Sequence, residues 1–326
     1  MQLSIVLPIY EEQATIGSLL AELVETLEAQ GFDFEIVAVD DGSADGTLQQ
    51  LQAARSRNPG RVNVVRHLYN KGNGAALRTG LRVSRGEIVV CMDADGQHSP
   101  TEIASLIALI PPYDLVIGAR LEGYRGPWHR RVANRFFNRL ASWLSRTAVL
   151  DLTSGFRAMR RSVALHFLPL FPDGFSAPTT TTLAFLKAGY NVAFVPINGR
   201  PRSAGQSKIR LWSDGMEFVL LILRMITLYD PLRIFLPTGS LLAGLGVLAA
   251  AAGMLRAGRL VLANSAILLF LAAIVTWLLG LIASQITASL IQYRGDETLL
   301  VNEDAFKREL VGAREGSGRN GDPPAR

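Results

Sequence analysis

The sequence predicts an α/β fold built on a mostly parallel sheet, followed by two helices long enough to cross a membrane. Short apolar runs alternate with helical segments over about the first 210 of the 326 residues. Strands joined by helices make right-handed crossovers, which give parallel pairing and helices on both faces of the sheet. Residues 234–255 and 260–283 carry no charged side chain. Each run exceeds the roughly 20 residues that span a bilayer core.

The composition agrees with this division. The chain is 49% hydrophobic and 19% charged, whereas soluble domains carry about 25% charged residues. The net charge of +5 is modest for this length and indicates an anionic surface or anionic ligands only weakly. We expect no nucleic-acid partner. A single cysteine, Cys91, excludes an internal disulfide and a cysteine zinc cluster. It stands inside the apolar run 88–92, which predicts a buried structural thiol.

Five strands and three helices are predicted in alternation. The apolar runs predict strands at residues 3–8, 34–39, 62–65, 88–92 and 114–118. Helices are predicted over residues 12–30, after Asp45-Gly46-Thr47, and over residues 74–83.

Polar side chains follow three of these strands where each strand ends. Tyr10 and Glu12 follow the first, Asp40 and Asp41 the second, and Asp93 and Asp95 the fourth. Ligands of such sheets bind beyond the carboxyl ends of the strands. We therefore expect these groups to converge on a ligand site at one edge.

The triplet Asp93-Ala94-Asp95, with Gln97 two residues on, predicts a metal site. Carboxylate and amide oxygens are hard ligands that suit Mg²⁺ or Mn²⁺. Such an ion would bridge a diphosphate and neutralise its charge as it leaves.

An ordered set of sequence blocks resembles family 2 glycosyltransferases, which have the GT-A (Rossmann-like) fold. The blocks are Pro8 to Glu12, Val39 to Ser43, Asn70 to Gly74, Asp93 to Gln97 and Gly118 to Arg120. Two later blocks, Asp151 to Arg157 and Arg202 to Lys208, resemble the polyprenyl-phosphate branch, to which dolichol-phosphate mannose synthases belong. The resemblance covers about residues 3–210.

The resemblance implies roles for the residues that match these blocks. The donor-binding set would be Pro8, Tyr10, Glu12, Ala38, Asp40, Asp93, Ala94, Asp95 and Gln97. Asp95 and Gln97 would bind the metal, with Asp93 touching ribose or metal. Asp40 is preferred to Asp41 for the nucleoside, because Asp41 has the alternative of capping the following helix.

Basic residues would hold the acceptor phosphate. The resemblance assigns Arg120, Arg202, Ser207 and Lys208 to it, and counts Asp95, Arg120, Arg202 and Lys208 as catalytic. Arginine suits this role because its fork binds phosphate bidentately. Asp151 is either a base for an alcohol acceptor or, as we prefer, an anchor for the turn at Ser154-Gly155-Phe156.

The implied reaction moves a sugar from a nucleotide-sugar, GDP-mannose or a UDP-hexose, to an undecaprenyl or dolichyl phosphate. The product would serve cell-envelope glycan synthesis or protein glycosylation. A lipid monophosphate is already an oxyanion at neutral pH. An in-line displacement with inversion therefore needs no general base.

Four segments are predicted: a GT-A domain at 1–208, interfacial amphipathic helices at 209–232, two transmembrane helices at 233–286, and a tail at 287–326 with a disordered end. Nucleotide-sugars are made in the cytosol. We therefore expect a multi-pass protein of the cell inner membrane with a cytosolic catalytic domain.

Three other interpretations remain at this point. A family 2 enzyme with a hydroxyl acceptor is one, although the Gln-x-x-Arg-Trp block of processive synthases is missing. A non-catalytic membrane scaffold and a nucleotide-dependent dehydrogenase are the others.

Gly72-Asn73-Gly74 lacks the dinucleotide pattern and predicts a turn with close helix packing. The sequence leaves open the sugar, the base, the prenyl length, the pathway, homo-oligomer formation, and Mg²⁺ against Mn²⁺.

Overall fold

The computed structural model describes residues 2–120, 128–174, 177–198, 200, 227, 230–257 and 263–287. The chain divides into two compact units, Met1–Ile222 and Leu223–Arg326. Each unit is considered by itself. Nearly all of the segment predicted to be interfacial, 209–232, and the tail beyond residue 287 lie outside the described residues.

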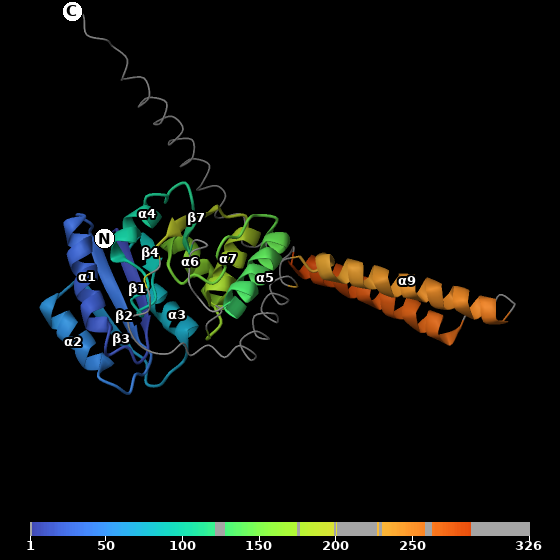
Figure 1. The fold of residues 1–326 in the computed structure, drawn as a ribbon, viewed down its shortest axis with the longest axis horizontal. Helices are drawn as coiled ribbons and strands as arrows, with labels where there is room; N and C mark the ends of the chain where they lie inside the picture. Colours follow the sequence, from blue (N-terminus) through green and yellow to red (C-terminus); the bar gives the residue numbers. More distant parts are fainter. Residues whose placement is uncertain are drawn as a thin grey trace, which may run out of the picture. The chain divides into compact units, whose positions relative to one another are not determined.

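The first unit is built on a seven-stranded sheet with the order β3-β2-β1-β4-β6-β5-β7 (Figure 1). The strands are β1 (Leu3–Ile9), β2 (Phe34–Asp40), β3 (Val62–Arg66), β4 (Ile88–Cys91), β5 (Leu115–Arg120), β6 (Arg157–Arg160) and β7 (Val192–Ile197). β6 runs antiparallel to both of its neighbours, and every other pairing is parallel. The predicted α/β fold with a mostly parallel sheet is therefore confirmed.

Helices cover the sheet on both faces. They are α1 (Ile16–Ala29), α2 (Thr47–Arg57), α3 (Asn73–Val83), α4 (Ile103–Ile107), α5 (Trp128–Ser145), α6 (Arg161–Phe167) and α7 (Ala177–Lys187), with short 3-10 turns at Pro100–Glu102 and Leu168–Leu170. α1 begins at Ile16, later than predicted, because the Glu12 carbonyl accepts from the backbone N–H groups of Thr15 and Ile16 and turns the chain first.

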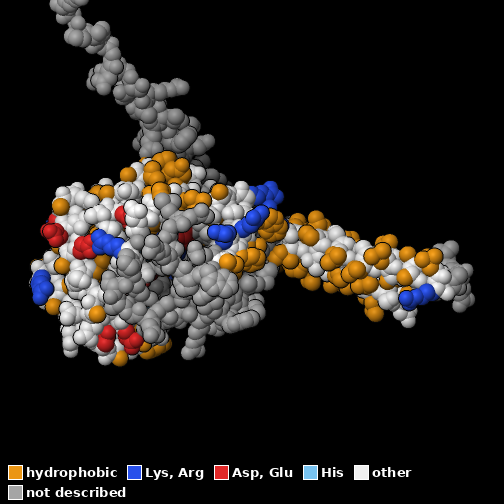
Figure 2. All heavy atoms as spheres, viewed as in Figure 1, with side chains coloured by type: hydrophobic (Ala, Val, Ile, Leu, Met, Phe, Trp, Pro, Cys, Tyr) orange, Lys and Arg blue, Asp and Glu red, His pale blue; other side chains and the backbone are white. Residues whose placement is uncertain are grey.

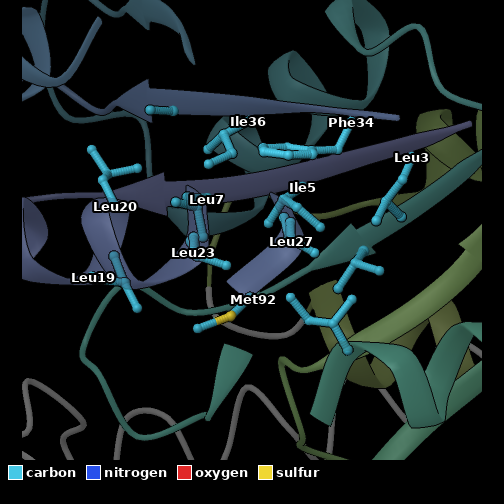
Figure 3. Close-up of a cluster of buried hydrophobic side chains, with 14 of the residues drawn as sticks. Leu3, Ile5, Leu7, Leu19, Leu20, Leu23, Leu27, Phe34, Ile36 and Met92 are labelled. Atoms are coloured by element: carbon cyan, nitrogen blue, oxygen red, sulfur yellow. The ribbon is translucent and has the colours of Figure 1, made fainter. Parts of the chain in front are cut away.

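The core lies between β1, β2 and α1 (Figure 3). Side chains alternate across a strand, so Leu3, Ile5 and Leu7 face one way and meet the leucines of α1 at 19, 20, 23 and 27. The intervening Val6 faces α3, where the absence of a side chain at Gly80 lets the helix approach closely. Cys91 is 3% exposed, as predicted for a structural thiol.

Two strands were not predicted from the sequence. β6 contains two arginines in four residues, a pattern that does not resemble a buried strand. It is nevertheless central, because Arg157 is 2% exposed and finds hydrogen-bond partners inside the protein. β7 contains Pro196 and lies at the edge of the sheet, where a missing backbone N–H is tolerated.

The second unit contains two long apolar helices, α9 (Leu232–Ala257) and a helix over residues 264–287. Both are long and apolar enough to cross a membrane. Hydrophobic side chains cover the outer surface of this pair (Figure 2), and Leu248 and Leu255 are 67% and 85% exposed.

Glycines and aromatic rings join the two helices. Gly239 lies against Trp277 and Gly246 against Phe270, in antiparallel register. Trp277 also donates a hydrogen bond from Nε1 to the Leu236 carbonyl at 3.2 Å. The sequence pair Gly244-x-Gly246 is therefore a packing site at Gly246 only, because nothing lies within 4 Å of the position of a Gly244 side chain.

Candidate active site

The predicted edge of the sheet collects segments from several strands. β1, β2 and β4 end there in parallel, at Ile9, Asp40 and Cys91. β6 runs the other way, with Arg157 opposite Cys91. The loop that precedes β6 therefore reaches the same edge as the loops that follow β1, β2 and β4. This antiparallel strand brings Asp151 and Gly155 to the carboxylates beyond β4.

Asp93 and Asp95 lie in the turn after β4, and both side chains are partly exposed. The backbone N–H of Gln97 donates to Asp95 Oδ1 at 3.1 Å, which fixes the turn. A side chain at Gly155 would lie within 2.8 Å of Asp93 Cγ and Oδ1 and still closer to Oδ2. The backbone of the 151–156 loop is therefore in close contact with the Asp93 carboxylate.

Asp40 and Asp41 differ in their partners. Asp41 is 2% exposed and holds the following loop, since it accepts from the backbone N–H groups of Lys71 (2.9 Å) and Gly72 (2.8 Å) and lies 2.6 Å from His67 Nδ1. The helix-capping role considered for Asp41 is therefore wrong. Asp40 holds its own turn instead, accepting from Ser43 N at 3.0 Å.

The second oxygen of Asp40 has a charged neighbour but no hydrogen bond. Oδ2 lies 3.3 Å from Nε of Arg66, outside hydrogen-bond geometry. Because Asp40 is fully buried, this oxygen is an acceptor that no described protein group satisfies. An unsatisfied buried acceptor is costly, so its retention requires an explanation.

The first loop carries the other donor candidates. Glu12 is half-buried and accepts from Thr15 Oγ1 at 3.0 Å, while its backbone N–H donates to Thr47 Oγ1 at 3.0 Å. Tyr10 is also half-buried. Pro8 and Ala38 are buried within β1 and β2 and offer no polar side-chain group.

Arg120 and Asp151 form the best-defined ion pair of the edge. Nε of Arg120 donates to Oδ2 at 2.8 Å, and Nη2 donates to Oδ1 at 3.2 Å and to Thr153 Oγ1 at 3.0 Å. Burial raises the pKa of the Asp151 carboxyl, but the hydrogen bonds and charge of Arg120 outweigh it and lower the pKa below its ordinary value. Asp151 is therefore an ionised partner of Arg120.

Arg202, Ser207 and Lys208 lie outside the described residues. Arg200 is the last described residue before them. The backbone N–H of Arg200 donates to the Gln97 carbonyl at 2.8 Å, and its Nη2 donates to Ser99 Oγ at 2.9 Å. Arg200, two residues before Arg202, is therefore held against the turn that follows β4.

Gly72 and Gly74 pack against backbone. Added side chains would collide with the carbonyls of Asp173 and Pro172, and the Gly74 N–H donates to the Asp173 carbonyl at 2.9 Å. The predicted role of close helix packing is confirmed. The N–H groups at the start of α3 are thus occupied by the loop at 172–174.

Two buried groups of this edge were not singled out from the sequence. Arg157 donates to the carbonyls of Ser154 and Pro178, and burial lowers its pKa to about 10 while neighbouring Cys91 opposes the shift. His98 stacks on Phe156 with ring centroids 5.0 Å apart. Arg157 ends one of the sequence blocks that carry the family resemblance, but nothing in the sequence marked it as buried, and no sequence signal marked His98.

Comparisons with known proteins agree with this geometry. The profile described as Glycosyl transferase family 2 matches residues 4–167, and that of the GtrB C-terminal hairpin matches residues 230–289. Among curated relatives, an undecaprenyl-phosphate 4-deoxy-4-formamido-L-arabinose transferase from Edwardsiella ictaluri is 31% identical over an alignment of 255 residues, with 74% of this chain and 73% of that protein covered. The protein of the same name from Pseudomonas fluorescens is 29% identical over 259 residues, covering 76% and 71%.

A solved structure shows the same fold. Glucosyl-3-phosphoglycerate synthase from Mycobacterium tuberculosis, in complex with Mn²⁺, UDP and glucosyl-3-phosphoglycerate, aligns with a TM-score of 0.54 at 21% identity, covering 69% of this chain and 79% of that one. The first profile spans half of the chain, and the relative from Edwardsiella covers three quarters of it. The chain therefore belongs to glycosyl transferase family 2, the family that the order of its sequence blocks resembles.

Proposed function

We propose that this chain transfers a sugar from a nucleotide-sugar to a polyprenyl phosphate with inversion at the anomeric carbon. One observation carries the proposal. The same chain contains a family 2 domain, with carboxylates at one edge of its sheet, and a pair of apolar helices that matches the GtrB C-terminal hairpin. The names of the curated relatives support it, because they specify undecaprenyl phosphate.

The donor set fits a nucleoside diphosphate with a divalent cation. Asp93, Asp95 and Gln97 offer hard oxygens from one turn, and Asp40 offers a buried acceptor for a base N–H or ribose hydroxyl. Among the described residues, no three His, Cys, Asp or Glu side chains lie close enough to hold a metal ion by themselves. That suits Mg²⁺ or Mn²⁺, which complete their shells with substrate phosphates and water. When bound, the ion would neutralise charge on the leaving diphosphate.

The acceptor phosphate removes the need for a base. A phosphate oxygen forms the new bond to the anomeric carbon while the bond to the diphosphate oxygen breaks, and the diphosphate takes the electron pair. No proton moves in this step, because a lipid monophosphate is already ionised. This agrees with Asp151, whose lowered pKa and pairing with Arg120 make it a poor proton acceptor.

Arg120, Arg202, Ser207 and Lys208 would hold the phosphates. Asp151 and Thr153 fix the plane of the Arg120 guanidinium, so its orientation is set before any ligand arrives. A charged group positioned in advance stabilises developing charge without reorganising. The proposal for the last three is supported by Arg200, which donates its backbone N–H to the Gln97 carbonyl two residues before Arg202.

A hydroxyl acceptor is the second candidate. It would require a general base at this edge, and Asp151 is the acid that the sequence offers for that role. The pairing with Arg120 disfavours it. We also propose that the hairpin crosses the cell inner membrane with the catalytic unit on the cytosolic side, where nucleotide-sugars are made.

The test is a transfer assay with membranes that contain the full chain. Mg²⁺ or Mn²⁺, undecaprenyl phosphate and a panel of labelled GDP- and UDP-sugars are supplied, and label in the lipid fraction is measured. We expect one donor to label undecaprenyl phosphate but not undecaprenol. Asp95→Ala should abolish transfer, whereas Glu28→Gln, a partly exposed carboxylate near the end of α1, should not.

Equal labelling of undecaprenol would show that the acceptor group is a hydroxyl and would contradict the proposed phosphate acceptor. If no donor gives transfer and Asp95→Ala behaves like the parent, the proposal that this chain transfers a sugar is wrong.

A further inference from the structure

One arginine ties the turn after β4 to a helix that is distant in the chain. Arg200 follows β7, and its backbone N–H donates to the Gln97 carbonyl at 2.8 Å. Its Nη2 donates to Ser99 Oγ at 2.9 Å. Its Nη1 lies 2.9 Å and 3.1 Å from the two carboxylate oxygens of Glu22, a residue of α1. A single guanidinium therefore joins the turn to α1.

Two further contacts hold the same segment. Thr15 Oγ1, at the start of α1, donates to the Ala94 carbonyl at 3.4 Å. The backbone N–H of Asn198, at the end of β7, donates to Glu102 Oε1 at 2.7 Å. α1 is a firm support for these contacts, because its leucines at 19, 20, 23 and 27 are buried in the core. The turn is thus attached to α1 and to the chain that follows β7.

Stability alone gives a weak reason for the Arg200 side chain. The side chains of Arg200 and Glu22 are 46% and 38% exposed, and exposed ion pairs contribute little to stability. The backbone bond to Gln97 is available to any residue at position 200 except proline. The arginine adds a rigid fork with two ends, one on α1 and one on Ser99. A fork of this kind fixes geometry.

The contacts of Arg200 act on the residues proposed to bind the metal. The Gln97 N–H donates to Asp95 Oδ1 at 3.1 Å, and the Gln97 carbonyl accepts from Arg200. Both backbone polar groups of Gln97 are therefore held. Groups that hold metal ligands from behind orient them, and the loss of such a group weakens metal binding.

We propose that Arg200 is a positioning residue, which directs Asp95 and Gln97 toward a divalent cation by clamping their turn to α1. The proposal rests on the proposed function, because that function assigns the cation to this turn. Arg200 acts through Gln97 and Ser99, and its role differs from the phosphate binding proposed for Arg202.

The sign of one effect separates a clamp from a charge. A positive charge near a cation site opposes binding of the cation. If Arg200 acted only through its charge, Arg200→Gln would strengthen metal binding. A clamp predicts the opposite, because the ligands lose their orientation. Ser99→Ala isolates the clamp further, since it removes one partner of the fork and changes no charge.

The test measures Mn²⁺ binding to the full chain in detergent, from the electron paramagnetic resonance signal of free Mn²⁺. UDP and GDP are supplied in separate series. We expect the Mn²⁺ dissociation constant to rise about 10-fold in Arg200→Gln, and to rise in Ser99→Ala as well. Arg200→Lys keeps the charge but offers one ammonium group to two partners, so it should restore binding only in part.

The matched control is Arg61→Gln. Arg61 also pairs with a glutamate of α1, with its Nε 3.3 Å from Glu28 Oε1, and its side chain is 42% exposed. It therefore loses the same charge and the same kind of ion pair, and we expect its Mn²⁺ affinity to equal that of the parent. Adding Glu22→Gln to Arg200→Gln should cost little beyond Arg200→Gln alone, because the two residues act through one clamp.

Thermal unfolding of each variant gives the second readout. We expect the midpoint of Arg200→Gln to stay near that of the parent, because the ion pair is exposed. A lower midpoint with unchanged Mn²⁺ affinity would assign Arg200 a structural role only. Tighter Mn²⁺ binding in Arg200→Gln would assign it a charge effect. Either result overturns the proposal, and Ser99→Ala decides if Arg200→Gln does not fold.

The parent separates this proposal from the proposed function. If the parent binds no Mn²⁺ with either nucleotide, the proposed metal and donor site is wrong, and the role of Arg200 is wrong with it. If the parent binds Mn²⁺ and both Arg200→Gln and Ser99→Ala bind it equally well, only the role of Arg200 is wrong. No sugar transfer is measured, so the result does not depend on the acceptor.

Discussion

Gly155→Ala is the sharpest probe of the proposed metal site, because a single methyl group would press on one carboxylate. The added carbon would lie 2.8 Å from Asp93 Cγ and Oδ1 and closer still to Oδ2, against an ordinary contact of at least 3.4 Å. The carboxylate must therefore retreat by about 0.6 Å or more. Misplacing a catalytic group by about 1 Å costs about 10²-fold in rate. We expect kcat/KM for sugar transfer to fall about 10- to 100-fold.

The measurement is steady-state transfer to undecaprenyl phosphate, accompanied by thermal unfolding to show that the variant folds. Gly174→Ala is the matched control, since nothing lies within 4 Å of its added carbon. The cause is tested by adding Asp93→Ala to Gly155→Ala. If the methyl group acts through Asp93, the double variant loses little beyond Asp93→Ala alone. Parental activity in Gly155→Ala, or losses that multiply, would refute the reasoning.

Three further outcomes are expected. Asp41→Ala removes acceptors for two backbone N–H groups, so it should lower the free energy of unfolding by about 1–3 kcal/mol by urea denaturation; an unchanged midpoint contradicts this. Asp151→Asn should destabilise by a similar amount at pH 7 by the same measurement. Because the pKa of Asp151 is lowered on folding, its contribution exists above about pH 4 and is lost below it, so parent and variant should converge in acid. Gly239→Leu should separate the apolar helices and lower the thermal midpoint in detergent, whereas Gly244→Leu should not.

Much of the site's location was predictable, because it depends on local patterns. Apolar runs identified β1, β2 and β4, and parallel strands end at a common edge, which placed Tyr10, Asp40 and Asp93 together. β6 was beyond this reasoning. Its four residues do not resemble a buried strand, because two of them are arginines. Arg157 can be buried only because it donates to the carbonyls of residues 154 and 178.

The pairing of β6 decided how the edge is arranged. Because it runs antiparallel beside β4, the loop at 151–156 meets the carboxylates, and Gly155 lies against Asp93. The same tertiary contacts committed Asp151 to Arg120, and committed Asp41 to the loop at 71–72. No spacing along the chain distinguishes these partners, since the pairs are 30 or more residues apart.

The sequence by itself determined the family, the alternating α/β plan and the two apolar helices, because periodicity, block order and uncharged length are local properties. The tertiary structure alone decided which acids are held by protein partners, which buried oxygen of Asp40 lacks a hydrogen bond, and which distant segments hold the turn after β4. Partners and exposure are set by segments distant in the chain, and they appear only when packing brings those segments together.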